Sequence, residues 1–128
     1  MQPLFLTLDE VLSLHELQLR LFGGSSGIRD LGLLQSAMGN AEATLDGVYL
    51  HGTVFEMAAA YLFGICRNHP FVDGNKRTAT AAALTFLHMN RITIEANEDA
   101  FYDLVIGVAE GRVSKAAVAV FFEETKAE

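Results

Sequence analysis

Within nine residues near the middle of the chain lie a histidine, a carboxylate, a glycine, an amide and two cations. The run is His69-Pro70-Phe71-Val72-Asp73-Gly74-Asn75-Lys76-Arg77. Histidine exchanges a proton near neutral pH, so His69 is a candidate general base for a hydroxyl nucleophile. Mg²⁺ favours one or two carboxylates beside phosphate oxygens, so Asp73 is a candidate metal ligand.

The segments on either side of this run indicate how it is presented. Residues 54–66 and 79–89 are alanine-rich, helical in length and apolar on nearly all sides, which is typical of helices buried at the centre of a domain. Pro70 disfavours helical backbone at the residue before it, so the first helix should end near Asn68. Residues 75–77 should open the second helix. We therefore expect a polar loop between two central helices.

The start of the second helix has the features of an anion site. A helix N-terminus offers unpaired N–H groups and a positive dipole, and Gly74 lets the backbone approach a bound group closely. Lys76 and Arg77 add two cations at this positive end, where cations are unfavourable unless an anion binds. The pattern predicts a polyphosphate, with Asp73 holding Mg²⁺ against it. Two alternatives stay open, namely Asp73 as a helix N-cap and the two cations as a solvated pair.

The run from His69 to Thr78 closely resembles the signature of the Fic/Doc family, His-x-Phe-x-(Asp/Glu)-(Gly/Ala)-Asn-(Gly/Lys)-Arg, at every defined position. The chain length and the run Gly-Gly-Ser-Ser-Gly-Ile-Arg-Asp at residues 23–30 are similar to the death-on-curing (Doc) toxin branch. The resemblance implies one all-α Fic/Doc-type domain over residues 1–128, with about six helices and at most a short β-hairpin flap. It also implies transfer of part of a nucleotide to a protein hydroxyl.

Two positions bear on which part of the nucleotide is transferred. By family resemblance, AMP-transferring Fic members have glycine where Lys76 stands and a second arginine where Thr80 stands. Doc members bind ATP in the opposite sense and transfer its terminal phosphoryl group. A lysine side chain also occupies the space of a tight backbone anion hole. The preferred interpretation is therefore a protein kinase, with AMP transfer and a catalytically silent nucleotide-binding module as alternatives.

Roles follow for six residues, with ATP and Mg²⁺ as the expected cofactors. The expected catalytic residues are His69, Asp73, Lys76 and Arg77; the expected nucleotide-binding residues are Gly74, Asn75, Lys76 and Arg77; and the expected metal ligand is Asp73. Asn75 has a second expected role in holding the loop backbone, and Phe71 is expected to be a buried anchor.

Family resemblance also suggests the partners. It implies a serine or threonine of elongation factor Tu as the modified group, and hence arrest of translation and growth. The chain lacks the (Ser/Thr)-x-x-x-Glu-(Gly/Asn) inhibitory segment of some Fic proteins, because Ile106 precedes Glu110-Gly111 at the Ser/Thr position. We therefore expect a separate antitoxin, a short segment that folds on binding.

Composition excludes several other classes of protein. The chain has 128 residues, 51% hydrophobic and 20% charged, which suits one folded domain and excludes a disordered one. Its net charge of −7 argues against a general nucleic-acid binder. The single cysteine, Cys66, excludes an internal disulfide. With no signal peptide and no apolar run of membrane-spanning length, the expectation is a cytoplasmic protein that binds no membrane.

Capping residues predict the remaining helices. Capping boxes at Thr7–Glu10 and Thr53–Glu56 mark two helix starts. Asp30, Asn97 and Ser114 are expected to cap three more helices, and residues 91–94 form a short extended piece.

Three further interpretations concern positions outside the motif. His15 is predicted to be a surface or satisfied core residue rather than a ligand. Residues 23–29 are predicted to form a flexible turn, with Arg29 pairing with an acid. Asp46-Gly47, between apolar residues, predicts a hairpin turn. That hairpin is either a surface loop or a flap that holds an extended target segment as an added strand.

Overall fold

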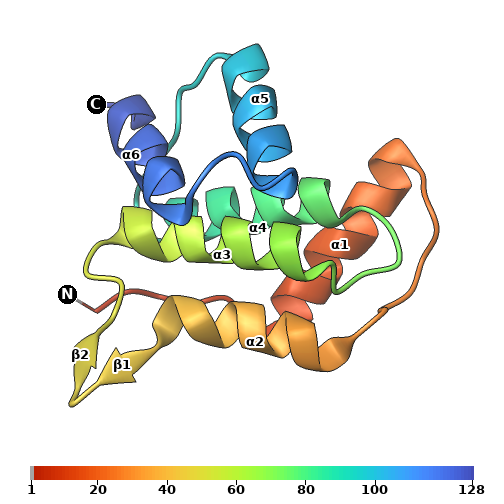
Figure 1. Cartoon of the computed structure of the whole chain (residues 1–128), viewed down its shortest axis with the longest axis horizontal. Coiled ribbons are helices and arrows are strands. Elements are labelled where there is room, and N and C mark those ends of the chain that lie inside the picture. Colours follow the sequence, from red (N-terminus) through yellow and green to blue (C-terminus); the bar gives the residue numbers. More distant parts are fainter. Residues whose placement is uncertain (1) are drawn as a thin grey trace.

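The computed structural model describes residues 2–128. It contains six helices and one two-stranded hairpin (Figure 1). The helices are α1 (Leu8–Phe22), α2 (Leu31–Glu42), α3 (Val54–Asn68), α4 (Asn75–Met89), α5 (Glu98–Ala109) and α6 (Lys115–Thr125). Strands β1 (Thr44–Leu45) and β2 (Val48–Tyr49) pair antiparallel between α2 and α3. The predicted all-α fold of about six helices with at most a short hairpin is confirmed.

The core is built around α3, as its apolar sequence predicts. Helices α2, α4, α5 and α6 all pack against it, and eight of its fifteen residues are buried (Figure 1). Small side chains allow close approach. At Gly64 an added Cβ would lie 2.9 Å from the Cβ of Ala37 in α2. Helix α1 packs mainly on α4, which brings it to the side of the loop between α3 and α4.

Side-chain caps begin each helix that was predicted to have one. The caps are Thr7, Asp30, Thr53, Asn97 and Ser114, and each accepts the backbone N–H three residues further on. The capping box at Thr7 is complete, because Glu10 accepts the Thr7 N–H in return. The expected second box is only half formed. Glu56 accepts the N–H of Gly52 at 3.1 Å instead of that of Thr53.

The hairpin lies at the N-terminal end of α3, whereas the predicted site follows its C-terminal end (Figure 1). Asp46 and Gly47 form the turn with φ values of 52° and 78°, the left-handed pair expected of a two-residue hairpin. A helix of 15 residues is about 22 Å long. That separation favours the surface-loop interpretation of the hairpin over the flap interpretation.

The extended piece near residue 94 is paired with the end of the chain. Ile94 and Lys126 form an antiparallel bridge, the Glu95 N–H donates to Thr125 O at 2.7 Å, and the Ala127 N–H donates to Thr93 O at 2.8 Å. This pairing joins the segment before α5 to the segment after α6, and both helices pack on α3. No helix among residues 2–128 is long and apolar enough to cross a membrane.

Candidate active site

The motif loop, residues 69–74, joins the end of α3 to the start of α4. Helix α3 ends at Asn68 as predicted, and His69 is exposed in a left-handed conformation with φ 47° and ψ 55°. Gly74 is the N-cap of α4 with φ 78° and ψ 19°, a conformation in which glycine carries no steric penalty. The loop is thus bounded by two left-handed residues.

Arg29 caps the C-terminal end of α3. Its Nε donates to His69 O at 2.6 Å and its Nη2 donates to Asn68 O at 2.7 Å. These bonds satisfy two of the carbonyl groups that a helix end leaves unpaired. The structural role expected for Arg29 is confirmed, but the expected acid partner is wrong, because the guanidinium bonds to carbonyl oxygens.

A short antiparallel pairing joins the run before α2 to the motif loop. The Arg29 N–H donates to Pro70 O at 2.7 Å, and the Val72 N–H donates to Gly27 O at 3.0 Å. The prediction of a flexible turn is therefore wrong for the second half of residues 23–29. Those residues are tied to the loop that follows α3.

The side chain of Asn75 closes the motif loop on itself. Its Oδ1 accepts the Phe71 N–H at 2.9 Å, and its Nδ2 donates to Phe71 O at 3.0 Å. Phe71 is 1% exposed, so the amide replaces hydrogen bonds that water cannot supply. Phe71 is the buried anchor that was expected, and Asn75 performs its expected loop-holding role.

His15 of α1 contacts the loop from the interior. Its Nε2 donates to Asp73 O at 2.8 Å, and its ring stacks on Phe71 with centroids 3.8 Å apart and planes 8° apart. The expectation of a satisfied core histidine is confirmed, but the sequence did not reveal that its partner is the motif loop. The sequence signal was only the spacing of His15 one helical turn after Val11, which places the two on one face of the helix without naming a partner, and both are buried in the structure.

The Asp73 carboxylate is exposed and accepts two backbone hydrogen bonds. Its Oδ2 accepts the Ser25 N–H at 3.1 Å, and its Oδ1 accepts the Gly74 N–H at 2.8 Å. These bonds lower the pKa of Asp73, and Arg77 contributes a smaller attraction. The N-cap alternative for Asp73 is wrong. Gly74 is the N-cap and no side chain caps α4.

A cavity of about 790 Å³ opens beside the start of α4, between α1 and α5. That size suits a small-molecule ligand. Five of the six predicted site residues line it, namely Asp73, Gly74, Asn75, Lys76 and Arg77. His69 is not part of the lining and lies exposed at the end of α3. Much of the remaining wall is apolar, including Phe22 of α1 and Phe101 of α5.

Both cations at the start of α4 are exposed. Within residues 2–128 the one ion pair joins Arg112 to Glu110, so no carboxylate oxygen lies within ion-pair distance of Lys76 or Arg77, and Asp73 attracts Arg77 from further away. The Arg77 guanidinium lies over the Phe22 ring, 4.7 Å from its centroid, a cation–π contact.

The carboxylate and cations fit a metal-bound polyphosphate better than a metal held by protein alone. Among the described residues, no group of three or more His, Cys, Asp or Glu side chains could hold a metal ion. Magnesium at this site would therefore rest on Asp73 together with oxygens of the ligand and water, a ligand set that magnesium accepts.

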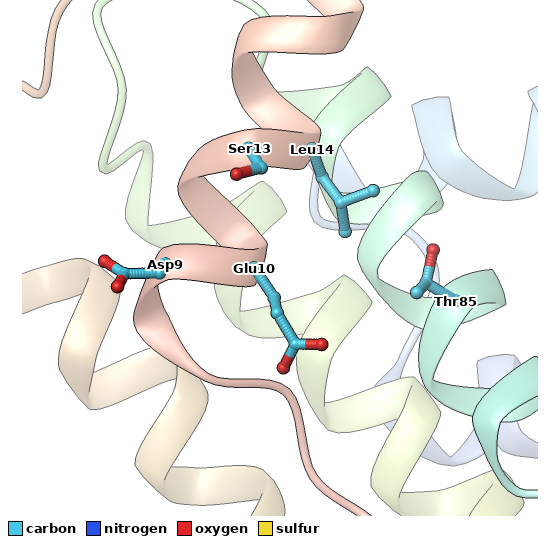
Figure 2. A pocket seen from close by; sticks show the side chains of 5 residues that line it. All are labelled: Asp9, Glu10, Ser13, Leu14 and Thr85. Carbon is cyan, nitrogen blue, oxygen red and sulfur yellow. The ribbon is translucent and has the colours of Figure 1, made fainter.

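A second hollow, of about 320 Å³, lies between α1 and α4. Figure 2 shows Glu10 and Leu14 projecting from α1 toward the helix that carries Thr85, whereas Asp9 points away. Its charged side chains are both carboxylates, which disfavour a phosphate ligand. The cavity at the start of α4 is therefore the candidate active site.

Comparison with known proteins gives a consistent assignment. The Fic/DOC family model matches residues 5–87, which include the whole motif loop. The chain is 49% identical over 78 residues to "Toxin Doc" of Mycolicibacterium smegmatis, a match that covers 61% of this chain and 60% of that protein. It is 35% identical over 112 residues to "Protein kinase doc" of Escherichia phage P1, covering 87% of this chain and 86% of that protein. The chain belongs to the Fic/DOC family.

Proposed function

We propose that this chain is the toxin of a toxin–antitoxin module and transfers the γ-phosphoryl group of ATP to a serine or threonine hydroxyl of a target protein. The observation that carries the proposal is the start of α4, where Lys76 and Arg77 lie exposed beside a ligand-sized cavity and form no ion pair. Cations at the positive end of a helix are unfavourable unless an anion binds there. The names of the two relatives, a toxin and a protein kinase, support the same interpretation.

In this proposal the phosphates of ATP lie against Gly74–Arg77. The stack on Phe22 orients the Arg77 guanidinium, whereas Lys76 supplies a flexible point charge. When bound, Mg²⁺ neutralises part of the phosphate charge and orients the phosphate oxygens. Asp73 is the residue that would hold it, since its carboxylate is exposed and is the one acidic side chain of the motif loop.

His69 is the proposed general base. Its side chain is exposed and has no hydrogen-bond partner among residues 2–128, while Arg29 fixes its backbone carbonyl. The target hydroxyl oxygen bonds to the γ-phosphorus as its proton passes to the imidazole. The bond between that phosphorus and the β–γ bridging oxygen breaks, and ADP leaves.

Lys76 and Thr80 support phosphoryl transfer over AMP transfer. A lysine at position 76 disfavours the tight backbone anion hole that a glycine there would allow. The Thr80 hydroxyl donates to Lys76 O at 2.9 Å and carries no charge with which to clamp an outer phosphate. We propose elongation factor Tu as the first target to test, and a cognate antitoxin as the partner that restrains the enzyme.

ATP labelled on either the γ- or the α-phosphate tests this function. The purified chain, Mg²⁺ and labelled ATP are incubated with elongation factor Tu and, separately, with a bacterial lysate. We expect label from the γ-position on the target, no label from the α-position, and a mass gain of one phosphate. Label from the α-position on the target would mean that the chain is an AMP transferase and not a kinase. ATP binding without transfer of either label would mean that the chain is a catalytically silent nucleotide-binding module.

A further inference from the structure

His15 is a buried titratable side chain that the proposed chemistry does not use. It lies in the middle of α1, whose start is fixed by a complete capping box, and it is 6% exposed. Its ring contacts two loop residues and lies near a third. It stacks on Phe71, bonds to Asp73 O and lies 3.7 Å from the point where a Cβ on Gly74 would stand. Because a carbonyl oxygen can only accept, the His15 Nε2 carries the hydrogen.

This bond fixes the peptide that joins Asp73 to Gly74. All peptide bonds in the described chain are trans, so the C=O and N–H of each peptide point in opposite directions. With the Asp73 carbonyl directed inward to His15, the Gly74 N–H points outward, where it donates to Asp73 Oδ1. Helix α1 therefore determines which group of this peptide faces the candidate active site.

Glycine at position 74 makes the opposite orientation accessible. Gly74 lies in the left-handed region at φ 78°, and glycine moves between backbone conformations at little steric cost. If the peptide rotated by half a turn, its carbonyl would face the cavity and its N–H would face inward. A negative dipole end would then stand where phosphate is expected, and the Asp73 carboxylate would lose a donor.

We propose that His15 is a positioning residue that holds the Asp73–Gly74 peptide in its anion-binding orientation and so sets the affinity of the site for nucleotide phosphates. The ligand class in this inference rests on the proposed function. The orientation of the peptide does not, since it follows from the hydrogen bond between His15 and Asp73.

Three substitutions separate the hydrogen bond from the packing. His15→Phe keeps an aromatic ring against Phe71 and removes the donor. His15→Gln places a donor nitrogen as many bonds from Cα as Nε2, and His15→Met matches glutamine in length without a donor. His88→Phe, an exposed position near the end of α4, is the control for the same change of residue type.

ATP binding in the presence of Mg²⁺ is measured by calorimetry, with thermal melting to verify folding. Loss of one buried hydrogen bond corresponds to about a tenfold change in an equilibrium constant, so His15→Phe and His15→Met should bind ATP about tenfold more weakly. His15→Gln and His88→Phe should bind ATP within about twofold of wild type. Equal affinities of the folded Gln and Met variants would overturn the proposal. So would failure of all three His15 variants to fold, because His15 would then be a structural core residue only.

Nuclear magnetic resonance of the ligand-free protein gives a readout that needs no nucleotide. We expect one Gly74 amide signal in wild type and in His15→Gln, and a displaced or doubled signal in His15→Phe and His15→Met. If wild type fails to bind ATP while this pattern holds, the proposed function is wrong and the role of His15 in orienting the peptide stands. If wild type binds ATP and the Gly74 signal is the same in all variants, the role of His15 is wrong and the proposed function stands.

Discussion

The two ends of α3 carry similar residues and are held in different ways. Each end has a histidine, a turn glycine and a non-glycine residue in the left-handed region, namely Asp46 at the hairpin and His69 at the motif loop. At the hairpin end, His51 bonds to Asn40 at 3.3 Å, and the two strands bond mainly to each other. At the motif end, side chains from α1, from the run before α2 and from α4 all bond to the loop.

The difference lies in the sequence distance of the partners. Asn40 is 11 residues from His51, whereas His15 is 58 residues from Asp73 and Arg29 is 40 residues from His69. A polar loop has few apolar side chains to bury, so hydrogen bonds from rigid helices must remove its conformational freedom. Transfer chemistry requires groups in fixed positions, and the motif end has the anchoring that such a site needs.

Removal of the histidine at each end should give the largest contrast. We expect His69→Ala to lower transfer by about 10²–10⁴-fold, the usual contribution of a general base, while ATP affinity stays near that of wild type. His51→Ala should leave transfer within about twofold, because its side chain is not part of the proposed site. Transfer rates and ATP affinity are measured for both variants. Near-normal transfer by His69→Ala at neutral pH would contradict its role as the base.

The asparagines of the two ends should differ in their contribution to folding. Asn75→Ala leaves the buried N–H and C=O of Phe71 without partners, and we expect the free energy of unfolding to fall by about 2–4 kcal/mol. Asn40→Ala, exposed beside His51, should change it by less than about 0.5 kcal/mol. Urea denaturation of both variants measures the difference. Equal losses would mean that the two ends are held equally firmly.

Substitution of the aspartate at each end of α3 tests the proposed metal site. Asp73→Asn should weaken ATP binding by roughly tenfold or more with Mg²⁺ present, since even outer-shell partners of a metal contribute about ten- to a hundredfold. Without metal the affinity should change little. Asp46→Asn, in the hairpin turn, should leave ATP binding unchanged, and asparagine tolerates its left-handed backbone. An equal loss with and without Mg²⁺ for Asp73→Asn would exclude the metal role.

Local signals were sufficient for most of the fold. Helix starts follow from Thr7, Asp30, Thr53, Asn97 and Ser114, because a cap and its N–H partner are three residues apart and both are visible in the sequence. The end of α3 follows from Pro70, and the hairpin follows from Asp46-Gly47. The second capping box failed for an equally local reason. Gly52 offers Glu56 a competing N–H one residue before Thr53.

The contacts that organise the site could not be predicted from the sequence. Arg29 can donate to carboxylates or to carbonyl oxygens. It bonds to carbonyl oxygens because the C-terminal end of α3 lies next to it in the folded chain. His15 has several possible partners on a helix face, and the packing of α1 on α4 selects Asp73. The motif identified five residues that line the cavity, whereas the residues that hold the motif depend on tertiary structure.

The smallest expected effect is a pH dependence at the hairpin end. Burial lowers the pKa of His51 from its ordinary value of 6.5, Lys115 lowers it further, and Glu56 opposes the change. Between the folded and unfolded pKa values the unfolded chain binds more protons. The free energy of unfolding should therefore fall as the pH drops from 6.5 toward the folded pKa, and stay constant below it.

His51→Gln removes the titrating group and should remove this part of the pH dependence. Urea denaturation of both proteins at about pH 7.5 and about pH 5.5 measures it, and the wild type should lose more stability over that interval than the variant. ATP affinity is measured at the same two pH values. If the two ends of α3 are independent, His51→Gln should leave the pH dependence of ATP affinity unchanged. Equal losses of stability in both proteins would mean that His51 has the same pKa in the folded and unfolded chain.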